Sequence, residues 1–206
     1  MTFVKLDRRT VLRSFLTLPL LAASGMPARA AATPQSAEGP FYPRPDMRFR
    51  DADNDLVKIQ SKVQNAGGEI VALTGRVLDL NGTPVSGARV EIWQCDANGR
   101  YLHTGDRRRI LRDPGFQGFG HVVTDESGAY AFRTIKPVPY PGRTPHIHVK
   151  VFAGTTELTT QFYIAGHPQN SRDSLYRRLS QSERRAVEMN FQNRGSVPTA
   201  RVDIIL

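Results

Sequence analysis

The sequence contains a single cysteine, Cys95, among its 206 residues. One cysteine excludes an internal disulfide and a zinc site built from several thiolates. The sequence also lacks the glycine-rich phosphate-binding loop, the Gly-x-Gly-x-x-Gly fingerprint and the Gly-x-Ser-x-Gly motif. It contains no internal repeat and no low-complexity tract. These absences argue against the commonest nucleotide-dependent enzymes, serine hydrolases and repeat proteins.

Acidic residues are fewer than basic ones, with 19 Asp and Glu against 28 Lys and Arg and a net charge of +9. Five of the basic side chains and one acidic side chain fall within residues 1–30, so the rest of the chain carries +5. This excess is mild, and it does not favour a nucleic-acid partner, which needs basic residues clustered on one face. The length indicates one domain with a short appendage.

The chain has no apolar run long enough for a membrane span at its N-terminus. The mostly apolar stretch over residues 15–23 has nine residues, about half of the ~20 that a membrane helix needs. Arg8 and Arg9 precede it, and an Ala-x-Ala signal follows at residues 28–30. Residues 1–30 thus resemble a twin-arginine export signal, which predicts a periplasmic or secreted protein exported in the folded state. An ordinary secretion signal and an uncleaved anchor are the alternatives, and no membrane partner is expected after signal removal.

The remainder of the chain reads mainly as β-structure. Residues 31–69 are rich in Pro, Gly, Asp and Asn without a sustained period, which predicts an extended arm and loops. Residues 70–206 form the predicted folded domain. Strands are expected at 70–78, 89–94, 121–124, 129–135, 146–152, 157–164 and 201–206, with helical spacing over 172–191. The predicted fold class is all-β, an antiparallel Greek-key β-sandwich with long loops and a short C-terminal helix.

The most informative motif is His146-Ile147-His148. Side chains alternate along a strand, so both imidazoles face one side and can share a metal ion. Alone the pair is a weak signal, because an isolated His-x-His is more often exposed or loosely packed. No Asp or Glu lies within eight residues of the pair. A site of two histidines and one carboxylate therefore needs a ligand from a distant part of the chain.

Two tyrosines lie close in the sequence to predicted strands: Tyr140 precedes the strand that carries the two histidines, and Tyr101 follows the 89–94 strand. Tyr140 lies in a proline-rich loop over 137–142, and prolines make such a segment stiff enough to aim a side chain. Tyr101 follows a turn after the 89–94 strand. Taken singly, each tyrosine is explained without a function, as an aromatic side chain in the core or at its edge. Trp93 is expected in the core, and Cys95 is expected to be a small buried residue.

Several segments in order resemble the intradiol ring-cleavage dioxygenases, in particular the beta subunit of the protocatechuate 3,4-dioxygenase branch. The segments are Glu38-Gly-Pro-Phe-Tyr-Pro43, the stretches 73–77, 90–101 and 128–137, Pro139-Tyr140-Pro141, Pro145-His146-Ile147-His148 and Thr160-Gln161-Phe162-Tyr163. The resemblance implies an oxidoreductase with one non-haem Fe(III) per chain, held by Tyr101, Tyr140, His146 and His148. A hard ferric ion favours such anionic oxygen donors, and binding it deprotonates a phenol whose free pKa is about 10.

The resemblance also implies the reaction and its partners, a catecholic aromatic substrate and O2. The ring opens between the two hydroxyl-bearing carbons, both atoms of O2 are inserted, and a cis,cis-muconate-type diacid results. By the same resemblance Tyr140 is displaced from the metal and takes up a proton, and Arg143 stabilises developing negative charge. Gln161 is expected beside the iron, and Tyr42 and Arg143 are expected to contact the substrate. Members of the family commonly form oligomers, so we expect that this chain can form a homo-oligomer.

The chain departs from the family pattern between Tyr140 and His146, which are only six residues apart. The protocatechuate enzymes carry a longer insertion there, so we expect a more open pocket, and the ring substituents of the substrate stay open. The basic residues 107–109 indicate a solvated loop or a subunit contact, or else attraction of anionic aromatic acids.

Two other functions remain open. One is a non-catalytic transthyretin-like or carboxypeptidase-regulatory-like binding sandwich, which the segment 81–90 also fits. The other is binding of ferric iron or a catechol without cleavage. Iron content separates the first from the dioxygenase, and oxygen uptake separates the second.

Overall fold

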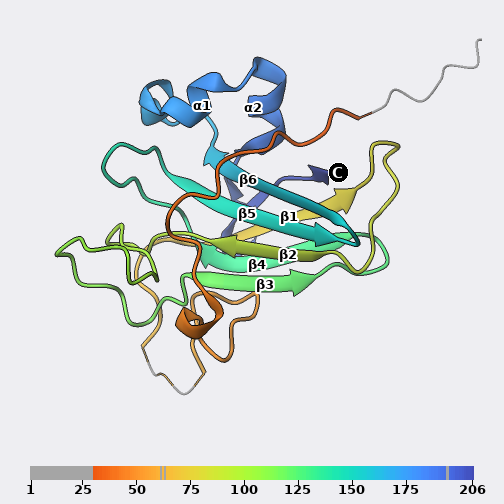
Figure 1. Ribbon diagram of the computed structural model, residues 1–206. Coiled ribbons are helices and arrows are strands. Elements are labelled where there is room, and N and C mark those ends of the chain that lie inside the picture. Colours follow the sequence, from red (N-terminus) through yellow and green to blue (C-terminus); the bar gives the residue numbers. More distant parts are fainter. Residues whose placement is uncertain (1–29, 61, 63, 194) are drawn as a thin grey trace, which may run out of the picture.

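The computed structural model describes residues 30–60, 62, 64–193 and 195–206 (Figure 1). The predicted export signal lies outside these residues, apart from Ala30 at its end, so it stays a prediction. Within the described part of the chain, no helix is long and apolar enough to cross a membrane.

The first sheet is built around β1 (Ile70–Leu78). Its antiparallel partner is β4 (Ala129–Ile135), in a register that sets Ile70 opposite Ile135. Parallel partners of β1 are β9 (Pro198–Arg201) and, farther along the strand, β10 (Ile204–Ile205). β8 (Gln192–Asn193) extends this sheet by pairing with β9.

The second sheet carries most of the residues that the sequence singles out. Its order is β3 (Phe119–Val123), β2 (Arg89–Trp93), β5 (His146–Ala153), β6 (Thr156–Ile164) and β7 (Glu188–Met189). The first four strands are antiparallel neighbours, and β7 runs parallel to β6. β5 is the central strand, so residues on its outward face have neighbours on both sides.

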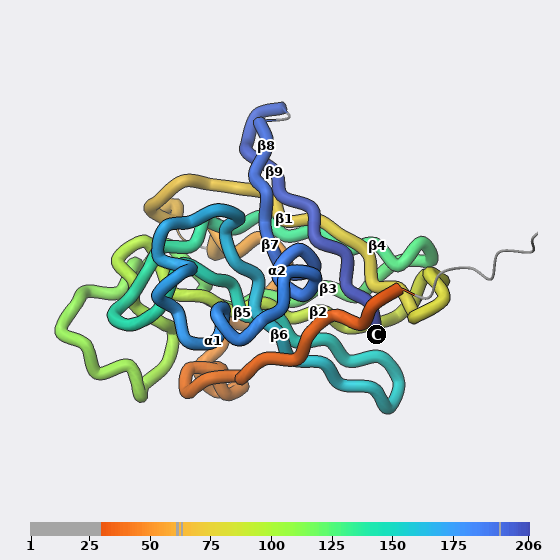
Figure 2. The backbone as a smooth tube through the Cα atoms, turned by 90° about the horizontal axis from the view of Figure 1, so that it is seen from above, coloured from red at the N-terminus to blue at the C-terminus, as the bar shows by residue number. Residues whose placement is uncertain are grey.

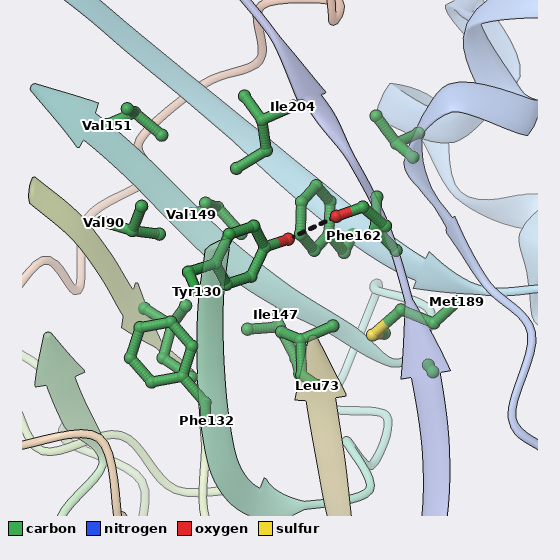
Figure 3. Packing of buried hydrophobic residues seen from close by; sticks show 14 of the residues in the cluster. Leu73, Val90, Tyr130, Phe132, Ile147, Val149, Val151, Phe162, Met189 and Ile204 are labelled. Atoms are coloured by element: carbon green, nitrogen blue, oxygen red, sulfur yellow. Dashed lines mark hydrogen bonds between the residues drawn. The ribbon is translucent and has the colours of Figure 1, made fainter. Parts of the chain in front are cut away.

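The two sheets pack face to face, because one buried cluster draws side chains from both (Figure 3). Leu73 and Phe132 come from the first sheet, and Ile92, Ile147 and Phe162 come from the second. Each of these five side chains is at most 2% exposed. Burial of this apolar surface is the main stabilisation of the fold. A second cluster, which includes Trp93, Cys95 and Tyr101, is separate from the first.

The predicted β-structure is confirmed in outline and corrected in detail. The strands expected at 70–78 and 129–135 have those bounds, and the next four lie within two residues of the predicted ends. The sheets are mixed rather than antiparallel, because β7, β9 and β10 run parallel to their neighbours. The segment 201–206 is not one strand, since β9 ends at Arg201 and β10 covers two residues. The Greek-key connection order stays a prediction.

The helical region is shorter and more broken than the spacing over 172–191 predicts. It consists of a 3-10 helix (Pro168–Arg172), α1 (Ser174–Arg178) and α2 (Gln181–Val187). Asp173 caps α1, and Ser180 begins α2 in a capping box with Glu183. Each cap satisfies free N–H groups at a helix start, so two short helices form where periodicity suggests one.

The N-terminal arm runs beside β6 before it reaches the outer face of the second sheet (Figures 1 and 2). The Ser36 amide donates to the Thr159 carbonyl at 2.8 Å, and the Thr160 hydroxyl donates to the Pro34 carbonyl at 2.7 Å. A 3-10 helix (Pro45–Met47) follows. The arm therefore covers the outward face of β5, where the two histidines lie.

Candidate metal centre

His146 and His148 lie on the outward face of β5, because Ile147 between them points into the core. Both are almost fully buried, at 1% and 2% exposure. Trp93 on β2 and Gln161 on β6 are the residues directly opposite His148 in the sheet. The Trp93 ring stacks on the His148 ring with centroids 4.7 Å apart and an interplanar angle of 11°. Gln161 therefore lies on the face of the sheet that carries the two histidines.

Three polar atoms converge at this face. The Nε2 atoms of His146 and His148 are 3.1 Å apart, and the Tyr101 hydroxyl lies 3.4 Å from the first and 3.2 Å from the second. A point equidistant from three atoms with these separations is about 1.9 Å from each, and metal bonds to nitrogen and oxygen are about 2.0–2.2 Å long. The three atoms are therefore spaced as the ligands of one metal ion would be.

The hydrogen bonds of the histidines favour binding of a cation. His146 Nδ1 lies 2.7 Å from the Thr144 carbonyl, which can only accept, so Nδ1 carries the proton and Nε2 presents its lone pair to the cluster. Burial lowers the pKa of His146 to about 4 and that of His148 well below its usual range, so both rings are neutral at pH 7. His148 Nδ1 is buried without a hydrogen-bond partner among the described residues.

Tyr101 reaches the cluster from the turn that follows β2. Its backbone amide donates to buried Asp106 at 2.8 Å, and its ring stacks on Phe41 with centroids 4.9 Å apart. Burial raises the pKa of the Tyr101 phenol well above its ordinary value. A phenolate at this position is therefore costly without a cation beside it. Its deprotonation by a bound metal ion would remove that cost.

Tyr140 stands at the edge of the cluster on a tight turn. Its ring centroid is 5.5 Å from that of His146 and 5.6 Å from that of Tyr101. Gly142, with a φ of 82°, follows Pro141, and the Arg143 amide donates back to the Tyr140 carbonyl at 2.9 Å. Proline followed by a glycine with positive φ is typical of a type II turn. The turn brings a guanidinium nitrogen of Arg143 within 3.5 Å of the Tyr140 hydroxyl.

Arg143 connects Tyr140 to the neighbouring strand and helix. Its guanidinium donates to the side-chain carbonyl of Gln161 at 2.5 Å and to Asp173 at 2.7 Å. Gln161 also donates to the Ala37 carbonyl at 2.8 Å, which links it to the N-terminal arm. Burial raises the pKa of the Tyr140 phenol, and the charge of Arg143 opposes that rise. Arg143 therefore favours the anionic form of Tyr140.

Tyr42 does not join the cluster. Its hydroxyl donates to Glu91 at 2.6 Å, and its ring packs edge-on against Trp93 with centroids 4.8 Å apart. The preceding residue, Phe41, is the one that contacts Tyr101. Phe41 belongs to a turn, and the two neighbouring side chains contact different residues. The predicted substrate contact of Tyr42 stays a prediction that this geometry does not favour.

Tyr140 lies between two surface hollows. One has a volume of about 390 Å³ and is lined by the 139–144 turn together with Gln169, Arg172 and Asp173. The other measures about 410 Å³ and is lined by Phe41, residues 105–108, Tyr140 and Pro141. Both are large enough for a single aromatic ring. A movement of the Tyr140 side chain would therefore change the shape of both hollows.

A carboxylate ligand does not appear among the described residues. No group of three or more His, Cys, Asp or Glu side chains in that part of the chain is arranged to hold a metal. The two histidines instead meet a tyrosine, with a second tyrosine beside them. This donor set, two neutral nitrogens and two phenols, suits a hard trivalent cation that deprotonates phenols.

Comparison with known proteins now identifies the family. A family model described as dioxygenase matches residues 37–203. The protocatechuate 3,4-dioxygenase beta chain of Burkholderia cepacia is 38% identical over 148 residues, which cover 68% of this chain and 63% of that one. The chain belongs to the intradiol dioxygenase family. Hydroxyquinol 1,2-dioxygenase of Nocardioides simplex is 30% identical over 169 residues, covering 72% of this chain and 53% of the relative. The chain thus spans less than two thirds of either relative.

Solved structures of the intradiol dioxygenase family share the fold. The dioxygenase domain of a dioxygenase and carbohydrate-binding protein fusion from Streptomyces sp. SirexAA-E is 33% identical. It has a TM-score of 0.65, with 85% of this chain and 98% of that domain covered. An intradiol ring-cleavage dioxygenase from Tetranychus urticae also has a TM-score of 0.65, but at 24% identity it supports the fold alone.

Sequence reasoning missed three residues that shape the site. Asp173 holds Arg143, Phe41 stacks on Tyr101, and the Thr144 carbonyl sets the proton position on His146. An Asp at the start of a segment with helical spacing predicts an N-cap, so the sequence alone indicates a capping role for Asp173. It does not predict the contact of Asp173 with Arg143. Phe41 and Thr144 act through contacts that only the folded chain creates.

Proposed function

We propose that the chain is a non-haem iron intradiol dioxygenase that cleaves catechol-type substrates. The aromatic ring opens between the two hydroxyl-bearing carbons, one carbon–carbon bond breaks, and each new carboxyl group gains an oxygen atom from O2. The product is a cis,cis-muconate-type diacid. The convergence of Tyr101, His146 and His148 to within 3.4 Å, in a chain of this family, is the observation that carries the proposal.

We assign one Fe(III) per chain to this cluster, with Tyr101, Tyr140, His146 and His148 as its ligands. Bound there, the ion would supply Lewis acidity that draws electron density from a chelated catecholate and makes its ring reactive toward O2. The described residues fit a ferric ion, because two phenolates offset two of its three charges and two neutral imidazoles complete the set.

The two tyrosines take different roles because their surroundings differ. Tyr101 is 1% exposed and packed under Phe41, so it is a fixed ligand. Tyr140 is only half-buried and borders both hollows, so its side chain has room to leave the cluster. As a phenolate, Tyr140 accepts one of the two protons that the catechol loses, which is general-base catalysis.

Arg143 and Gln161 act on the charge that develops beside the cluster. The Arg143 guanidinium, held by Asp173, faces the Tyr140 hydroxyl and so stabilises negative charge on the substrate oxygen that replaces it. Gln161 is fixed by three hydrogen bonds, from Arg143, from Tyr163 and to Ala37. It therefore acts as a rigid support for the guanidinium.

Oxygen consumption with labelled O2 tests this proposal. The purified, iron-loaded protein is mixed with catechols carrying different ring substituents under ¹⁸O2, and the product is analysed by mass spectrometry. The proposal expects consumption of one O2 per catechol and a diacid with two labelled oxygens. A protein that binds catechol but consumes no O2 would favour the binding function instead. Tyr130→Phe is a suitable control, because the Tyr130 hydroxyl, on β4 of the first sheet, donates to the Val202 carbonyl and has no contact with the cluster residues.

We also propose that residues 1–30 direct export by the twin-arginine route. The support is the pair Arg8-Arg9, the short apolar stretch and the Ala-x-Ala signal. A variant with Arg8→Lys and Arg9→Lys should remain in the cytoplasm, whereas the unaltered chain should appear in the periplasm or medium. Export that survives this double change would contradict the route.

A further inference from the structure

The Asp173 carboxylate sits where the helical region meets the metal centre. Its side chain is fully buried. One oxygen, Oδ1, accepts from the Leu175 and Tyr176 amides at 3.0 Å each and so caps α1. The other oxygen, Oδ2, accepts from Arg143 Nε at 2.7 Å and from the Thr144 amide at 3.0 Å. Four donors thus share one carboxylate, and two of them belong to the segment that leads into β5.

The two hydrogen bonds accepted by Asp173 Oδ2 position two different groups of the centre, the Arg143 guanidinium and the His146 imidazole. Holding Arg143 by Nε turns its remaining nitrogens toward Gln161 and the Tyr140 hydroxyl. Holding the Thr144 amide fixes a peptide whose carbonyl accepts from His146 Nδ1 at 2.7 Å. That hydrogen bond sets which nitrogen of His146 presents its lone pair to the cluster.

We propose that Asp173 is a positioning residue that fixes Arg143 and His146 together. Its carboxylate aims the guanidinium at Tyr140 and, through Thr144, orients the metal-binding imidazole. The capping of α1 is a separate task of the same side chain, carried by its other oxygen. The kinetic part of this inference rests on the proposed function, whereas the structural part concerns the metal-free chain.

The capping task and the positioning task can be separated by substitution. Asp173→Asn and Asp173→Ser both keep a side-chain oxygen that can cap α1. Asp173→Asn replaces the charge with a neutral amide, and Asp173→Ser is too short to bridge to Arg143. Ser180→Ala is the matched control, because it removes the cap of α2, and Ser180 bonds only within its own capping segment.

The first readout needs no iron and no activity. In ¹⁵N NMR spectra of the metal-free protein, Arg143 Nε–H and His146 Nδ1–H should give protected, slowly exchanging signals, because the first donates to the fully buried Asp173 carboxylate and the second lies in a buried hydrogen bond. Both signals should be lost or exchange rapidly in Asp173→Asn and Asp173→Ser, and both should persist in Ser180→Ala. Persistence of both signals in the Asp173 variants would overturn the proposal, even if the chain proves to have no dioxygenase activity.

The second readout is the split between kcat and KM per bound iron. Misplacement of a group by about 1 Å can cost about 100-fold in rate, so kcat of the Asp173 variants should fall between ~10-fold and ~100-fold. KM should change much less, because the guanidinium acts on charge that develops during the reaction. Combining Asp173→Asn with Arg143→Gln should cost little more than Arg143→Gln alone. Additive losses, or an unchanged kcat in both Asp173 variants, would contradict a role through Arg143.

Discussion

The Tyr42 hydroxyl donates a hydrogen bond of 2.6 Å to Glu91, a carboxylate that is 2% exposed. Glu91 also pairs with Arg89 at 2.7 Å and with Arg48 at 3.8 Å. The bond attaches the N-terminal arm to the outer face of β2. It therefore stabilises the arm that brings Phe41 onto Tyr101 and Gly39 onto His148.

Tyr42→Phe should lower stability and leave substrate binding unchanged. The change removes one hydrogen bond to a charged, buried carboxylate and keeps the ring on Trp93, so the free energy of unfolding should fall by about 1.5–3 kcal/mol. Urea unfolding measures this loss, and KM for the best catechol should match that of the unaltered protein. A raised KM with unchanged stability would instead support direct substrate contact by Tyr42.

Gly39→Ala should weaken metal binding as well as the fold. Gly39 has a φ of 77°, and a Cβ there would lie 3.3 Å from His148 Cε1. Gly82→Ala is the matched control, because Gly82 has a φ of 83° but open space around it. Both changes should cost about 1–2 kcal/mol of stability through the left-handed backbone. Only Gly39→Ala should lower the affinity for Fe(III) in a titration, and equal affinities in both variants would show that this contact is unimportant.

The metal-free protein should lose stability as the pH falls from 7 to 5. Burial lowers the pKa of His146 to about 4 and that of His148 well below its usual range, so both rings stay unprotonated in the folded chain while the unfolded chain takes up protons near 6.5. Each histidine should cost up to about 1.4 kcal/mol per pH unit below 6. Denaturant unfolding at pH 7, 6 and 5 measures the slope. His121, whose pKa burial also lowers, contributes in the same direction, so His121→Gln serves as the reference background. A flat stability in this range would contradict neutral, buried imidazoles.

The sequence predicts β1 and β4 well because the hydrophobic pattern and the burial of both strands agree. β1 and β4 have the predicted ends, since alternating apolar residues and glycine-containing turns delimit both. The short strands β7 and β8 have only two residues each and no pattern of their own. They form because neighbouring strands offer free backbone groups, which is a tertiary effect. The helical spacing over 172–191 predicts one continuous helix because the apolar residues recur across Ser180, where the structure instead has the N-cap of α2.

The proposed metal ligands are predictable only in part. Strand alternation alone places His146 and His148 on one face, and pairing of β5 with β6 brings Gln161 beside them. Only the family resemblance indicates Tyr101 and Tyr140 as metal ligands. No local sequence pattern predicts that the two loops carrying these tyrosines meet at the same strand. The structure brings Tyr101 into direct contact with both imidazoles and leaves Tyr140 at the edge.

The visible absorption spectrum of the purified protein, with its iron content, tests the central claim most directly. The account predicts about one iron per chain and a red-brown colour from tyrosinate-to-Fe(III) charge transfer, with a shifted and broadened band after a catechol is added under nitrogen. Tyr101→Phe should lose much of this absorption, whereas Tyr130→Phe should keep it. A colourless protein that holds no iron after ferric reconstitution would contradict the metal centre and the dioxygenase function built on it.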